Sequence, residues 1–113
     1  MNQEAAEAVM EFIKDHPGTT YAEIETVFDR IGFEWKGDLV QCDGANDSIV
    51  FWEDWNSEAI KVVNGLLQSG AIRKEPTHPI IYIVDGKTLP LPAAKVRRKY
   101  KKPHWLPITF SAV

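Results

Sequence analysis

The residues of this chain with the clearest chemical capacity are six cationic side chains in one short run. They fall within eight positions near the C-terminus: Lys95, Arg97, Arg98, Lys99, Lys101 and Lys102. Lysine and arginine side chains neutralise phosphate groups, and the rings of Tyr100 and Trp105 are surfaces on which a base could stack. The run is therefore typical of a segment that contacts the backbone of DNA or RNA.

The remainder of the chain is acidic. Of 13 basic and 16 acidic residues, positions 1–94 hold seven basic and all 16 acidic ones, so their formal charge is −9 against +6 for positions 95–102. This separation leaves three targets open for the run: a nucleic acid, an acidic protein partner, or the acidic surface of the chain's own body. A targeting signal is a minor fourth interpretation, because short basic runs have several meanings.

The segments on either side of the run differ from it in character. Leu89-Pro90-Leu91-Pro92 should be extended and stiff, because each proline fixes its own φ and restricts the residue before it. Four large apolar residues follow the run within six positions: Trp105, Leu106, Ile108 and Phe110. We expect them to dock into an apolar groove. Positions 89–113 are thus predicted to form a spacer, a basic strap and an apolar anchor.

Positions 1–88 have the pattern of one folded domain. Apolar residues at helical spacing predict helices over 3–15, 20–31 and 56–69. The second helix begins with Thr20 and Glu23 in a capping box, a pair that satisfies the free backbone groups of a helix start. Between the second and third helices, positions 33–56 predict an inserted hairpin or loop.

Two further segments predict β-strands. Ala71–Lys74 and Ile80–Val84 predict a two-stranded hairpin, because β-branched residues flank a five-residue tip. Ile49 to Trp52 are apolar at every position, so a strand there must be covered on both faces or meet a partner. The fold class is therefore predicted to be α+β.

Four aromatic residues of the insertion have two interpretations: Trp35, Phe51, Trp52 and Trp55. Large aromatics in a small domain are mostly core residues. The alternative is a platform that stacks on single-stranded nucleic acid or anchors a protein partner.

The order of elements resembles the winged-helix superfamily. Ala59 to Arg73, running into Ile80–Val84, is similar to the recognition helix and wing of that fold, and Thr20 to Ile24 is similar to the start of its second helix. The resemblance covers about positions 3–86 and implies binding of DNA or RNA. One departure is that some 24 residues separate the second and third helices, where the helix-turn-helix unit has about 3–4.

We therefore expect a non-enzymatic nucleic-acid-binding protein of a small regulatory or mobile-element type. The resemblance assigns base and phosphate contacts to Lys61, Asn64 and Gln68 of the third helix and to Arg73 and Lys74 of the wing, beside the basic run. The alternative is a protein-interaction module on the same scaffold, with an acidic or apolar partner or a second copy. Its contacts would be Trp35, Trp52, Trp55 and Trp105.

Composition and residue spacing bear on whether the chain is a membrane protein, a metalloprotein or an enzyme. The chain has 113 residues, enough for one domain, and no apolar run approaches the roughly 20 residues that a membrane span needs. Cys42 is alone, which fits a reducing cytoplasm, and its expected role is a small, partly buried side chain. No His or Cys spacing indicates zinc, and no phosphate loop or nucleophile motif is present. We expect no metal, cofactor, membrane contact or catalytic residue.

Overall fold

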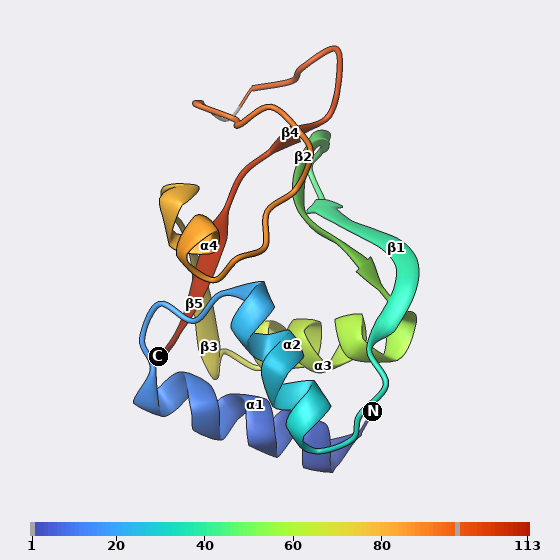
Figure 1. Cartoon of the computed structure of the whole chain (residues 1–113), viewed down its shortest axis with the longest axis vertical. Helices are drawn as coiled ribbons and strands as arrows, with labels where there is room; N and C mark the ends of the chain where they lie inside the picture. Colours follow the sequence, from blue (N-terminus) through green and yellow to red (C-terminus); the bar gives the residue numbers. More distant parts are fainter. Residues whose placement is uncertain (1, 97) are drawn as a thin grey trace.

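The computed structural model describes residues 2–96 and 98–113 and has the predicted α+β class. Its helices are α1 (Gln3–Asp15), α2 (Tyr21–Arg30), α3 (Ser57–Gln68) and the short α4 (Ile80–Val84). Its strands are β1 (Lys36–Asp43), β2 (Asn46–Trp55), β3 (Ile72–Pro76), β4 (His104–Trp105) and β5 (Ile108–Ala112). The three longer helices gather at one end of the molecule, and positions 95, 96 and 98–102 lie at the other end (Figure 1).

The three predicted helices are confirmed, and local signals explain each start. Asn2 accepts a hydrogen bond from the Ala5 amide at the start of α1, and Asn56 accepts one from the Ala59 amide at the start of α3. The capping box of α2 is present in both directions, between Thr20 and Glu23. These caps satisfy amides that a helix start leaves without partners.

The inserted hairpin is also confirmed, as antiparallel strands β1 and β2 joined at Gly44 and Ala45. It is irregular at its base, where Lys36 and Leu39 both pair with Trp55 and Asp54 has a φ of 68°. Trp52 and Trp55 are three positions apart, and a regular strand would place them on opposite faces. The bulge reverses this alternation, so both indoles enter the core.

Gly37 is required at this bulge because two backbones approach closely. A Cβ atom at Gly37 would lie 2.7 Å from the Cα atom of Asn56, which is the N-cap of α3. The residue type at position 37 thus couples the base of the hairpin to the start of the third helix.

The predicted wing hairpin is wrong. Ile80–Val84 forms helix α4, and β3 pairs instead with β5, from Ile72 opposite Ala112 to Pro76 opposite Ile108. A short apolar run fits a strand or a helix equally well by pattern alone. Tyr82 favours the helix at this position. Within α4 its ring is completely buried, and its hydroxyl donates a 2.6 Å hydrogen bond to the Ile108 carbonyl of β5.

The C-terminal segment is part of the core and not an extended tail. β4 pairs in parallel with β2, β5 pairs with β3, and Thr19 forms a further bridge to Phe110. The predicted anchor residues are all buried: Trp105, Leu106, Ile108 and Phe110. Ile49 to Trp52 are all buried, so both faces of this part of β2 are covered by the chain itself.

A buried carboxylate, Glu25 of α2, organises this core. Its Oε2 atom accepts hydrogen bonds from the indole nitrogens of Trp52 and Trp55, both at 2.8 Å. Its Oε1 atom accepts one from Nζ of Lys87 at 2.6 Å, and that Nζ also lies 4.8 Å from the centre of the Trp35 ring. Glu25 is only 5% exposed, so a charge here persists because both oxygens have partners.

Replacing Glu25 by alanine should cost about 3–5 kcal/mol of unfolding free energy, because two buried indole N–H groups and a lysine would lose their acceptor. Glu25→Gln keeps one acceptor oxygen and should cost less. Urea denaturation followed by tryptophan fluorescence measures both. Glu58→Ala is the matched control, since it breaks the exposed ion pair with Lys61 and should cost less than about 1 kcal/mol. A Glu25→Ala loss no larger than the control's would contradict this assignment.

Tyr82 supplies a pH-dependent term to stability. Burial raises the pKa of its hydroxyl, an effect that the hydrogen bond from the Tyr21 amide partly opposes and the Asp85 carboxylate reinforces. The unfolded chain therefore loses this proton first, so the stabilisation is complete below about pH 10 and declines as the pH rises further. In Tyr82→Phe, the slope of unfolding free energy above pH 10 should fall by up to about 1.4 kcal/mol per pH unit. Parallel curves for the two proteins would rule out this contribution.

Candidate nucleic-acid interface

We call residues 95–102 the basic loop; its described residues, 95, 96 and 98–102, project beyond the β1–β2 turn without regular secondary structure (Figure 1). Its neck is closed by backbone hydrogen bonds from Ala94 to Trp105 and from Trp105 to Pro92, each 2.8 Å long. Two more bonds attach the loop to the hairpin, from the Asn46 side chain to the Arg98 carbonyl and from the Tyr100 amide to Ser48. The core thus determines where the loop stands.

Tyr100 gives the loop its internal order. The His104 ring stacks on it with 3.8 Å between ring centres, and the Arg98 guanidinium carbon lies 4.4 Å from the same centre. Both groups therefore lie against this ring. The Tyr100 hydroxyl also donates a 2.7 Å hydrogen bond to the Val96 carbonyl. The ring is thus engaged within the loop, and a base could stack on it only by displacing one of these contacts.

The cations of the loop point into solvent. The structure describes Lys95, Arg98, Lys99, Lys101 and Lys102, and all five are exposed; Arg97 lies outside the described residues. Within the described part of the chain, none of the five has a carboxylate oxygen within 4.0 Å. Four of them, together with Tyr100 and His104, surround a hollow of about 480 Å³. The acidic body of the same chain therefore forms no ion pair with these five described cations.

The cations and amides predicted on the third helix and wing are in a different region. Lys61 is paired with Glu58 at 3.4 Å, and Arg73 is paired with Glu75. Gln68 is exposed on α3. Since the loop lies at the opposite end of the long axis from α3 (Figure 1), these residues and the loop do not form one continuous face.

Of these predicted residues, Asn64 and Lys74 are the two that share a groove. Both line a groove between α3 and the hairpin, although α3 carries one and β3 the other. The Nζ atom of Lys74 lies 4.5 Å from the centre of the Phe51 ring. This groove is a second location, separate from the basic loop.

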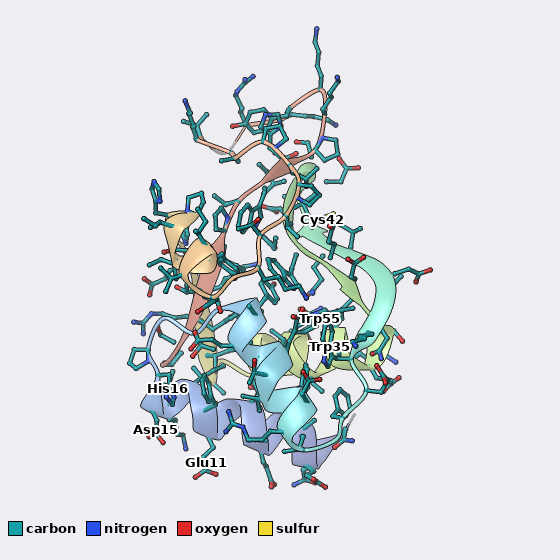
Figure 2. All side chains as sticks on the ribbon, viewed as in Figure 1. Glu11, Asp15, His16, Trp35, Cys42 and Trp55 are labelled. Atoms are coloured by element: carbon teal, nitrogen blue, oxygen red, sulfur yellow. The ribbon has the colours of Figure 1, made fainter. Side chains whose placement is uncertain are left out.

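The tryptophans proposed as partner contacts lie inside the protein. Trp52 and Trp55 are fully buried, Trp35 and Trp105 nearly so. Figure 2 shows Trp35 and Trp55 next to each other in the interior, and their ring centres are 6.4 Å apart. Of the two interpretations of the aromatic group, this placement matches the core.

An exposed apolar surface on α4 was not predicted from the sequence. Ile80, Ile81, Ile83 and Val84 are between 41% and 80% exposed, while Tyr82 between them is buried. The signal was present in the sequence as five consecutive apolar residues after Pro79. A helix of little more than one turn has no room to bury them all on one side.

Other reactive side chains do not form a site. Cys42 is exposed, contrary to the partial burial predicted, and partial desolvation followed by the Asp47 carboxylate raises the pKa of its thiol. Figure 2 shows Glu11 and Asp15 on α1 and His16 directly after it. His16 stacks on Phe12, and its Nδ1 lies 2.9 Å from the Phe12 carbonyl oxygen. No three metal-ligating side chains come together within the described residues.

In residues 2–96 and 98–113, no helix has the length and apolar character needed to cross a membrane. Comparisons with models of known protein families, with curated proteins and with solved structures found no match to this chain.

Proposed function

We propose that this protein binds nucleic acid without catalysis and that the basic loop holds the phosphate backbone. The observation that carries the proposal is the set of five described loop cations, all exposed and without a carboxylate partner among the described residues. The hydrogen bonds at the neck already order the loop before binding. Less conformational entropy is therefore lost when the loop binds a ligand.

The charge of the body favours one orientation of the bound protein. Positions 1–94 carry a formal charge of −9 and repel a phosphate backbone, whereas the loop attracts it. We therefore expect the protein to approach the nucleic acid with the end that carries the loop. Binding through this end relies on phosphate contacts, which carry no base sequence.

Duplex is the preferred form in this proposal. Stacking on single-stranded bases needs a free aromatic face, and Arg98 and His104 already lie against the Tyr100 ring. Phosphate contacts gain more from duplex, which has one charge per about 1.7 Å of helix axis.

The winged-helix arrangement stays a proposal as well. Its support is that β3 pairs with β5 and Thr19 bridges β5, so three segments that flank the helices share one small sheet. In this arrangement residues 77–107 replace the short wing loop and carry the basic loop with them. We also keep the cytoplasmic location as a proposal, on the ground that Cys42 has no partner cysteine in the sequence.

Removing three loop lysines tests the interface. Lys99→Gln, Lys101→Gln and Lys102→Gln together should weaken duplex binding and reduce the slope of log affinity against log salt by about 2–3, since each phosphate contact contributes about 0.9. Fluorescence anisotropy with a labelled duplex across a salt series measures both quantities.

The matched control removes three lysines from the body: Lys14→Gln, Lys36→Gln and Lys61→Gln. It changes the net charge equally and should leave the slope unchanged, with only a small loss of affinity from the long-range field. Equal effects of the two triple variants would show that net charge alone drives binding. A wild-type protein that does not bind duplex at low salt would exclude the proposed function.

A second candidate function, a homodimeric interaction module, is favoured by the exposed aliphatic residues of α4. Exposed apolar clusters of this kind mark interaction surfaces in soluble proteins. A second copy is the fitting partner, because the +6 loop of one chain could meet the −9 body of another.

The mass of the protein in solution tests this candidate. A dimer by light scattering that becomes a monomer in Ile83→Asp would support it, since a charge on that face is costly to bury in an interface. Leu39→Asp is the control, as Leu39 is an exposed aliphatic residue on β1, away from α4. A monomeric wild-type protein at high concentration would remove the candidate.

A further inference from the structure

The groove that contains Asn64 and Lys74 has the features of a small-molecule site. It lies between β1, α3 and β3 and encloses about 210 Å³. This volume is below the roughly 300 Å³ at the lower end of pockets for drug-sized ligands, so the space suits a fragment-sized molecule.

A buried amide without a partner points to a ligand in this groove. Gln41 of β1 lines it and is only 8% exposed. Its Nε2 atom is fully buried and has no hydrogen-bond partner among the described residues. Buried donors are nearly always paired in folded proteins, so a turn of the Gln41 side chain toward the groove would give this N–H group an acceptor there.

The charge of the residues that line the groove indicates the charge of its ligand. Lys74 is the one charged residue among the residues that line the groove, and none of the others is acidic. Its Nζ is held over the Phe51 ring, so the cation is in place before a ligand arrives. The acidic body repels anions at long range, so the attraction is confined to the immediate surroundings of Lys74.

The other residues that line the groove indicate the chemistry of the uncharged part of the ligand. Phe51, Ile60 and Leu67 supply apolar surface beside Lys74 and Gln41, and Asn64 adds an amide from α3. Phosphate or sulfate would leave this apolar surface unused, whereas a carboxylate on an apolar ring would use both parts of the groove.

We propose that this groove binds a small organic carboxylate with an aromatic or aliphatic body. The carboxylate accepts from Lys74 Nζ and Gln41 Nε2, and the body packs on Phe51 and the aliphatic residues of α3. The site is separate from the basic loop and does not rest on the nucleic-acid proposal.

Titration with benzoate, monitored by the side-chain amide resonances of the ¹⁵N-labelled full chain, tests the proposal. Gln41→Leu assigns the Gln41 resonance by its absence. We expect a saturable shift of that resonance with benzoate, and at least ten-fold weaker binding of benzamide, which has the same shape without the charge. Sodium chloride at equal ionic strength provides the baseline.

Two substitutions separate a binding role from a structural one. Lys74→Gln should weaken benzoate binding at least ten-fold, whereas Lys61→Gln on the exposed side of α3 should leave it unchanged. Gln41→Leu should abolish the binding and yet raise the melting temperature by about 4 °C or more, because it removes an unpaired buried amide.

The proposal is overturned if benzoate produces no saturable shift, which would indicate that the groove holds water only. It is also overturned if benzamide binds as well as benzoate, or if Lys74→Gln binds as well as the wild type. A lower melting temperature in Gln41→Leu would show that Gln41 has a structural partner.

Discussion

The carboxylate of Glu25 is the interaction on which the rest of this structure depends. It accepts hydrogen bonds from Trp52, Trp55 and Lys87, and so it joins helix α2, strand β2 and the segment after α4 at one buried point. An unpaired charge in this position would be costly, so the three donors and the acceptor must assemble together. The bulge at the base of the hairpin is what makes this assembly geometrically feasible, because it turns both indoles toward α2.

Anchoring of the C-terminal segment follows from the same core. Trp105 packs against Trp52 and Tyr82, with ring centres 6.2 and 5.3 Å away, and β5 completes the pairing of β3. The chain must therefore leave the core after α4 and return to it at β4, and the basic loop is the excursion between these points. In this way a core built around the Glu25 carboxylate carries the cationic loop at the far end of the molecule, where the described cations are exposed and make no ion pair.

The sequence predicted those features that arise from local signals. The three longer helices followed from caps and apolar spacing, and the inserted hairpin followed from its turn residues and β-branched strands. The pairing of β3 with β5 was not predictable, because it joins residues far apart in the chain and competes with a nearer apolar run, Ile80–Val84. Residues of the basic loop could be named from composition, but their separation from α3 depends on tertiary packing. The groove at Gln41 needed the structure for the same reason, since no spacing links Gln41 to Lys74.

We propose that the basic loop, and not the third helix, contacts the nucleic acid. Chemical-shift mapping of the labelled protein with a short duplex tests it most directly. The account predicts that shifts concentrate at positions 95–104 and at the hairpin residues Asn46 and Ser48, which hold the loop. Shifts concentrated at Lys61, Asn64 and Gln68 of α3, with the loop unaffected, would contradict it.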